Sequence, residues 1–110
     1  MLQALTLTYE GPLYDAARRK DWEELAKLLA AGEPVDKLFY DDPLLCYPVN
    51  AGRLDIVKLL LEHRADPNEE GLWGTPIASA LFQYWHPKPV AEINWEIVEA
   101  LLDAGAELNP

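Results

Sequence analysis

The sequence predicts an all-α fold in which three similar helix–turn–helix units stack side by side as a solenoid. Its 110 residues are 50% hydrophobic and 25% charged, a composition typical of one globular domain over residues 1–110. Three stretches share the apolar spacing i, i+3, i+6 and i+7, which is one stripe of an α-helix. In chain order they are Trp22, Leu25, Leu28 and Leu29; Leu54, Val57, Leu60 and Leu61; and Trp95, Val98, Leu101 and Leu102. One such unit cannot bury its stripe alone, so the three must stack.

Each stripe follows a shorter helical candidate, so each unit consists of helix, turn, helix and loop. The shorter candidates begin near Pro12, near Pro43 and at Thr75. Thr75 is an expected N-cap, because Pro76 follows it in the first turn, where a missing N–H costs nothing. Asp21 opens a capping-box pattern ahead of the first stripe.

The units are expected at about residues 12–42, 43–74 and 75–110, after an N-terminal segment of residues 1–11. That segment alternates apolar and polar residues, which fits either a short strand or an arm over the first unit. The stripes are 54 − 22 = 32 and 95 − 54 = 41 residues apart, so the third unit carries about nine extra residues.

The extra residues fall between the two helices of the third unit, at about residues 84–93, and include two prolines that stiffen them. Two interpretations remain open for this insertion. In the first, Trp85 and Ile93 form a lid over the exposed end of the stack, because a terminal repeat needs a cap. In the second, Trp85 contacts a partner, since insertions in solenoids fall on one edge and are often functional.

Several residues carry a resemblance to a known family. They are Thr75-Pro76-Ile77; Gly52-x-x-x-Ile56-Val57-x-x-Leu60-Leu61-x-x-Arg64-Ala65-Asp66-x-Asn68; Gly32; and Gly105-Ala106-x-x-Asn109. On these residues the chain resembles an ankyrin-repeat protein over about residues 12–110. The resemblance implies a curved stack of helix pairs whose inter-repeat loops project as fingers. It also implies that the concave side, formed by the fingers and the first helices, binds another protein.

Three residues depart from the family pattern. Arg64 and Lys20 stand where the family places glycine, and a non-glycine residue in a left-handed cap costs about 1 kcal/mol. The change Arg64→Gly is therefore expected to raise the melting temperature. Pro48 falls within the first helix of the second unit, where its missing N–H is expected to kink or shorten that helix.

Charge narrows the class of partner. The chain has 9 basic and 19 acidic residues, a net charge of −10, and residues 65–110 hold Lys88 alone against eight acidic residues. Phosphate groups are repelled by such a surface, so we expect no binding to nucleic acid or to an anionic membrane. A basic protein is the favoured partner. The alternative is that the acidic surface only keeps the protein in solution.

Cysteine usage and the N-terminus bear on localisation. Cys46 is the only cysteine, so no internal disulfide can form, which fits a reducing compartment. Residues 1–11 lack the features of a secretory signal, and no apolar run reaches the length of a membrane span. A cytoplasmic protein is therefore expected.

The candidate partner-binding residues lie on the two predicted fingers and the insertion. Aromatic and leucine side chains beside paired carboxylates make good interface anchors when exposed. The alternative is that the apolar ones pack between fingers. The candidates are Leu38, Phe39, Tyr40, Asp41, Asp42, Glu69, Glu70, Leu72, Trp73 and Trp85.

Signals for catalysis are mostly absent. Ser79 falls mid-helix beside alanines, and Cys46 has no obvious base in the pattern. His63 and His86 are far apart in sequence and make no metal signature, so neither a cofactor nor a metal is expected. An enzyme or a metal-binding protein is the most distant alternative.

The sequence thus predicts a non-catalytic protein-interaction module for a basic partner. A short, acidic chain of this family resembles bacterial immunity or antitoxin proteins, which cover the active site of a basic toxin domain. That resemblance implies a toxin inhibitor. The alternative within the binding class is a general adaptor or scaffold domain.

Overall fold

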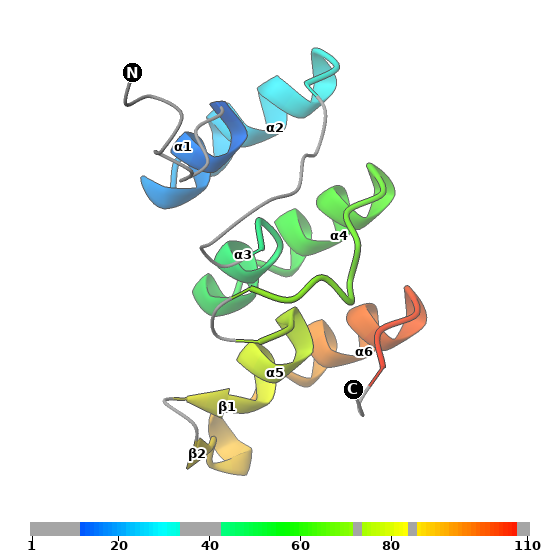
Figure 1. Cartoon of the computed structure of the whole chain (residues 1–110). Helices are drawn as coiled ribbons and strands as arrows, with labels where there is room; N and C mark the ends of the chain where they lie inside the picture. The colour runs from blue at the N-terminus through cyan, green and yellow to red at the C-terminus, as the bar shows by residue number, and fades with distance from the viewer. Residues whose placement is uncertain (1–11, 34–42, 72–73, 84–85, 108–110) are drawn as a thin grey trace, which may run out of the picture.

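Three pairs of helices stack one above another in the computed structural model (Figure 1). The structure describes residues 12–33, 43–71, 74–83 and 86–107. Within them the pairs are α1 (Pro12–Arg18) with α2 (Trp22–Ala30), α3 (Cys46–Ala51) with α4 (Leu54–Glu62), and α5 (Pro76–Leu81) with α6 (Trp95–Asp103).

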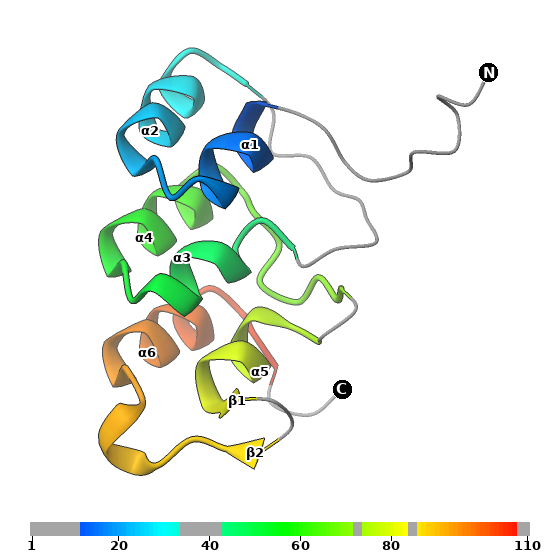
Figure 2. The ribbon, with the colours of Figure 1, turned by 90° about the vertical axis from the view of Figure 1, so that its left-hand side faces the viewer.

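Each helix packs on its partner in the pair and on its counterpart in the neighbouring pair. Figure 2 shows α1, α3 and α5 on one side of the stack and α2, α4 and α6 on the other. The predicted helical character of the fold is therefore confirmed.

Side-chain caps define the start of three helices. The side-chain oxygens of Asp21, Thr75 and Asn94 each accept a hydrogen bond from the backbone N–H three residues later, at 3.2, 3.3 and 3.2 Å. Each bond satisfies a helix N–H that has no partner within the helix. The caps predicted at Asp21 and Thr75 are confirmed, whereas the sequence analysis missed Asn94. α4 follows Arg53, whose side chain makes no cap bond.

Left-handed residues end five of the helices at repeating positions. After the second helices the φ angles are +94° at Gly32, +71° at Arg64 and +102° at Gly105. After α1 and α3 they are +61° at Lys20 and +72° at Gly52. The left-handed conformation expected at Arg64 and Lys20 is therefore confirmed, with its steric cost for a residue that carries a Cβ.

Pro48 changes how α3 begins. The N–H groups of Cys46 and Tyr47 bond to carbonyl groups three residues back, at 2.9 and 3.2 Å, and the α-helix begins only at Cys46. Pro48 has no N–H to bond to the carbonyl four residues earlier, so this tighter turn replaces the first α-helical turn. The effect of Pro48 is a displaced start, and its ring is buried.

The third pair departs from the all-α expectation. A two-stranded antiparallel hairpin, β1 (Phe82–Gln83) with β2 (His86–Pro87), leaves the end of α5, and the short 3₁₀ helix η2 (Val90–Glu92) follows. Phe82 has extended backbone angles, φ −126° and ψ 156°, where α1 and α3 end in a left-handed turn. These angles are those of a β-strand, in which aromatic residues are common, so the chain passes directly from α5 into β1.

The core runs through all six helices, but the predicted stripe of α6 is only partly buried. Leu25, Leu60 and Leu101 are fully buried, as expected. Trp95 and Leu102 are 52% and 41% exposed, so the expectation that the whole third stripe is buried is wrong for these two residues. In the part of the chain that the structure describes, no further helix pair packs beyond α6 to cover them.

Candidate functional site

The loop after α4 is joined to the loop after α6 by one side chain. The amide nitrogen of Asn68 donates to the carbonyl of Gly105 at 3.0 Å, and its amide oxygen accepts from the N–H of Glu107 at 2.8 Å. Its own N–H donates to the carboxylate of Asp66 at 2.8 Å, which closes a local turn. Asn68 thus holds together two loops that are almost forty residues apart in sequence.

The same loop turns back toward α5. Gly71 and Gly74 exchange two backbone hydrogen bonds, at 3.1 and 3.3 Å. Gly74 has φ +105°, a conformation that glycine adopts without steric cost. The loop then enters the N-cap of α5 at Thr75. Asn68 and this glycine pair give the loop a defined path along α5.

Most of the predicted partner-binding residues lie outside the described residues, so their role stays a prediction. These are Leu38, Phe39, Tyr40, Asp41, Asp42, Leu72, Trp73 and Trp85. The structure does place Glu69, which is half-buried, and Glu70, which is exposed.

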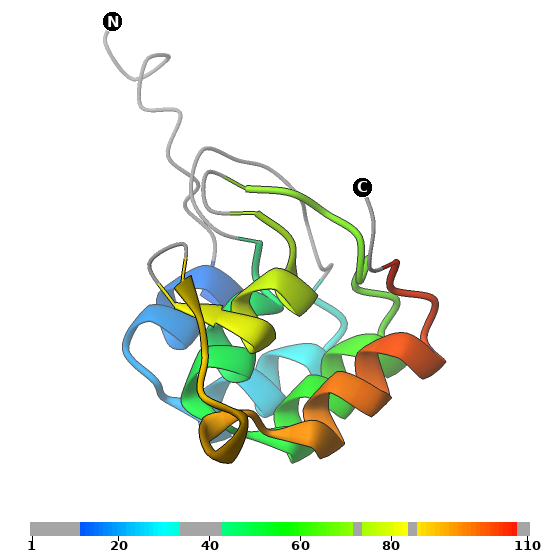
Figure 3. The ribbon, with the colours of Figure 1, turned by 90° about the horizontal axis from the view of Figure 1, so that it is seen from below.

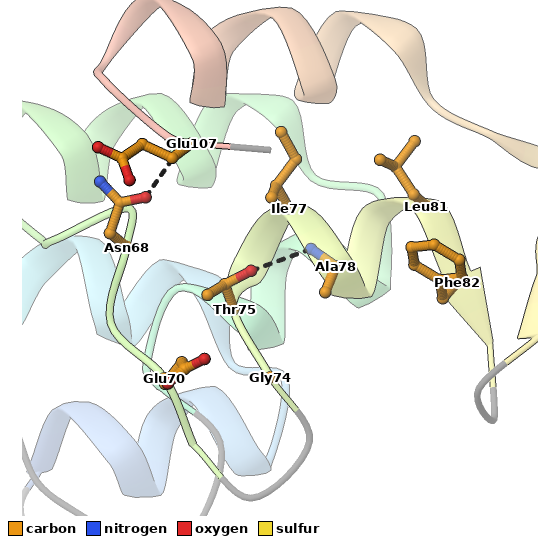
Figure 4. Close-up of a pocket in the computed structure, with 9 residues that line it drawn as sticks. All are labelled: Asn68, Glu70, Gly74, Thr75, Ile77, Ala78, Leu81, Phe82 and Glu107. Atoms are coloured by element: carbon orange, nitrogen blue, oxygen red, sulfur yellow. Dashed lines mark hydrogen bonds between the residues drawn. The ribbon is translucent and has the colours of Figure 1, made fainter. Parts of the chain in front are cut away.

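A cavity of about 520 Å³ lies between this loop, α5 and the loop after α6 (Figure 4). Its lining residues are Asn68, Glu70, Gly74, Thr75, Ile77, Ala78, Leu81, Phe82 and Glu107. The volume falls within the range of sites that hold small molecules or single side chains.

The cavity is polar at one end and apolar at the other. Figure 4 shows Glu70 and Glu107 on the same side as Asn68, whereas Leu81 and Phe82 lie at the opposite end. None of the described lining residues is basic. The lining thus combines carboxylate side chains at one end with apolar side chains at the other.

The third helix pair and the loop before it are strongly acidic in sequence. Between residues 65 and 107, Lys88 stands against Asp66, Glu69, Glu70, Glu92, Glu96, Glu99, Asp103 and Glu107, a local net charge of 1 − 8 = −7. A cation that approaches the third pair is therefore attracted before it makes any contact.

Of the residues that line this cavity, Glu70 alone was among the predicted partner-binding residues. Asn68, Phe82 and Glu107 come together only because helix pairs stack and bring separate loops to one place. One signal was present: an Asp in a loop, such as Asp66, is typical of a turn in which its side chain accepts from the N–H two residues on, here that of Asn68.

Outside the cavity, the described part of the chain holds few groupings of nucleophilic or metal-ligating side chains. The Ser79 hydroxyl lies 3.6 Å from the sulfur of buried Cys46, a contact that joins α5 to α3. No group of three or more His, Cys, Asp or Glu side chains able to hold a metal ion occurs among the described residues. None of the helices in the described ranges is long and apolar enough to cross a bilayer.

Comparison with known proteins bears on the second helix pair. The family model of the ankyrin repeat matches residues 41–71, which contain α3, α4 and the loop that carries Asn68. No curated protein matches the chain significantly. Ankyrin-repeat domains are generally non-catalytic interaction modules. Both helices of the matched pair end at a left-handed residue, as both helices of the first pair do. The match supports the ankyrin-repeat family and a role in protein–protein interaction.

Proposed function

We propose that the three helix pairs are three ankyrin repeats, at about residues 12–42, 43–74 and 75–110, and that the chain is a non-catalytic module that binds a basic protein. The cavity of the third pair carries this proposal, since it combines two carboxylates with an apolar end formed by Leu81 and Phe82. A basic side chain of the partner enters it, with the cation at Glu70 and Glu107.

Binding proceeds in two physical stages. The acidic surface of residues 65–107 accelerates encounter with a cationic partner, an effect that salt weakens. Contacts with buried apolar area then slow dissociation. The predicted finger residues Phe39, Tyr40, Leu72 and Trp73, which lie outside the described residues, are proposed to supply such contacts.

Among basic partners, a toxin domain is the one we propose. A small acidic module of this kind can cover the active site of an enzyme that must itself attract a polyanion such as nucleic acid. The resulting complex keeps the toxin inactive in the cytoplasm until it is needed elsewhere. A general adaptor is the alternative.

Affinity capture tests the proposal. Immobilised protein is exposed to lysate of cells that express it, at low and high salt, beside the double variant Glu70→Gln, Glu107→Gln and the control Glu23→Gln on α2. We expect basic proteins to be retained, and to be lost with salt or with the double variant only. If retention is unchanged by salt and by the double variant, the cavity is not the binding site. Stoichiometric suppression of a captured enzyme identifies an inhibitor, whereas unaffected activity identifies an adaptor.

A further inference from the structure

Exposed large hydrophobic side chains gather on the third helix pair. Among the described residues they are Phe82, Val90, Trp95 and Leu102, exposed by 45%, 70%, 52% and 41%. All four belong to elements of the third pair, and none to the first two pairs. Figure 3, which views the stack from below, shows α5, α6 and the hairpin at this end. We call the side of α6 that carries Trp95 and Leu102 the end face.

The repeat position of Leu102 explains why it is exposed. Leu29 occupies the same position on α2 and is 1% exposed, and Leu61 occupies it on α4 and is half-buried. α2 packs on α4, and α4 packs on α6. Exposure therefore rises at one repeat position toward the end of the stack, which indicates that this position faces the next helix pair. Leu102 has the side chain of an interior position, and among the described residues no helix pair packs beyond it.

The opposite end of the stack is closed differently. Ile56 and Ile97 occupy one repeat position on α4 and α6 and are 5% and 0% exposed. On α2 the same position is Glu24, which is half-buried. A solenoid needs a polar outer surface at its ends to stay soluble, and Glu24 supplies one at the first end. The end face lacks such a replacement, so it keeps the character of an interior surface.

Acidic side chains run beside the apolar ones on α6. Glu99 follows Trp95 by four residues and precedes Leu102 by three, so all three lie along one side of the helix. Asp103 follows Glu99 by a further four residues. Lys88 is the only Lys or Arg among residues 86–107. A second copy of the chain would place acid against acid here, so the complementary occupant is apolar and positively charged.

We propose that the end face binds an amphipathic basic α-helix of a partner protein, which lies along α6 where a further helix pair would pack. Its apolar stripe contacts Trp95 and Leu102, and its Lys or Arg residues pair with Glu99 and Asp103. This site goes beyond the proposed function, because it uses a different surface from the cavity. Phe82 lines the cavity and is left unchanged in the experiment.

A designed peptide tests the site without knowledge of the natural partner. The probe is a fluorescein-labelled helical peptide of about 18 residues, long enough to populate a helix, with Leu at i, i+3, i+4 and i+7 and Lys beside the Leu stripe. A matched peptide has Glu in place of every Lys. Binding to the full chain is followed by fluorescence anisotropy, and circular dichroism verifies that each variant is folded.

We expect saturable binding of the Lys peptide and none of the Glu peptide. The double variant Trp95→Ala, Leu102→Ala should weaken binding by about tenfold or more, as loss of an aromatic anchor does. The variant Glu99→Gln, Asp103→Asn should weaken binding and reduce its salt dependence. Leu28→Ala, at the opposite end of the stack, and Glu70→Gln, in the cavity, should leave the dissociation constant unchanged.

Several results would overturn the proposal. They are failure of the Lys peptide to bind, equal binding of the Glu peptide, and an unchanged dissociation constant for the Trp95→Ala, Leu102→Ala variant. Sedimentation that shows a dimer broken by Trp95→Ala would assign the end face to a second copy instead. A loss of binding with Glu70→Gln alone would place the peptide in the cavity and would overturn the end-face site.

Discussion

The second helices of the first and last pairs share their backbone geometry, whereas the outer surfaces of the two pairs differ in exposed apolar side chains. Both second helices begin at a side-chain cap, Asp21 or Asn94, and both end at a left-handed glycine, Gly32 or Gly105. The first pair exposes no large hydrophobic side chain among the described residues, whereas the last exposes four. Local hydrogen bonds thus set the helices, while the presence or absence of a neighbour sets what is buried.

The difference at the two ends has a functional meaning. At the first end of the stack, the polar residue Glu24 buries less apolar surface than an isoleucine would, and it makes that end more soluble. Retained apolar residues at the last end keep a surface on which another element can pack, at a risk of aggregation. The acidic side chains beside them reduce that risk, because they repel a second copy.

The largest expected effect separates Leu29 from Leu102, which occupy the same repeat position. Leu29→Ala should lower the free energy of unfolding by about 2–5 kcal/mol, since it opens a cavity between α2 and α4. Leu102→Ala should lower it by less, by about 1 kcal/mol, because 41% of the residue is already exposed. Urea unfolding followed by circular dichroism measures both. Equal losses would mean that the end face is covered in solution.

A smaller effect is expected at the caps, where the two ends should behave alike. Asp21→Ala and Asn94→Ala should each lower the free energy of unfolding by about 1 kcal/mol, because each leaves a helix N–H without its side-chain partner. Arg53→Ala is the matched control, since Arg53 holds the same position before α4, makes no cap bond, and loses only an exposed, solvent-screened pair with Asp55. If Arg53→Ala costs as much as the other two, the caps are not the cause.

Arg64 in the middle pair occupies the repeat position that Gly32 and Gly105 occupy in the first and last pairs, so substitutions at these three residues can be compared. Arg64→Gly should raise the free energy of unfolding by about 1 kcal/mol, because its φ of +71° strains a residue with a Cβ. Gly32→Ala and Gly105→Ala should lower it by a similar amount. A Cβ at either glycine would meet nothing within 4 Å, so only backbone conformation is tested. Thermal melting distinguishes the signs, and a fall with Arg64→Gly would contradict the expectation.

The smallest effect concerns an ion pair of the middle pair. The Arg53 guanidinium donates to both carboxylate oxygens of Asp55, at 3.1 and 2.9 Å, and these bonds lower the pKa of Asp55. The unfolded chain therefore takes up this proton more readily than the folded chain. The stabilisation is complete above the ordinary pKa of an Asp and is lost as pH falls through the lowered folded value.

Both groups of this pair are exposed, so solvent screens the contribution to stability. The direct measurement is the NMR titration of the Asp55 carboxyl carbon, with Arg53→Gln as the comparison. We expect the titration midpoint to rise toward the ordinary range in the variant. An unchanged midpoint would show that the pair is not populated in solution.

Local features of the fold were predictable from the sequence, and long-range ones were not. The stripes, the caps at Asp21 and Thr75 and the strained Arg64 depend on residues a few positions apart, so their patterns can be read directly. The hairpin after α5 was missed because a two-residue strand leaves no periodicity to detect. The cavity was missed because Asn68 meets Glu107 only after the pairs stack.

By itself, the sequence determined where helices form and which stripe of each carries leucine, because capping and helical periodicity act within a few residues. Only the tertiary structure decided which leucine at a given repeat position is buried. Leu29 and Leu102 have the same spacing and local geometry, yet Leu29 is 1% exposed against a neighbouring helix pair and Leu102 is 41% exposed. Burial depends on the neighbour that packs against a side chain, and that neighbour is set by the order in which the pairs stack.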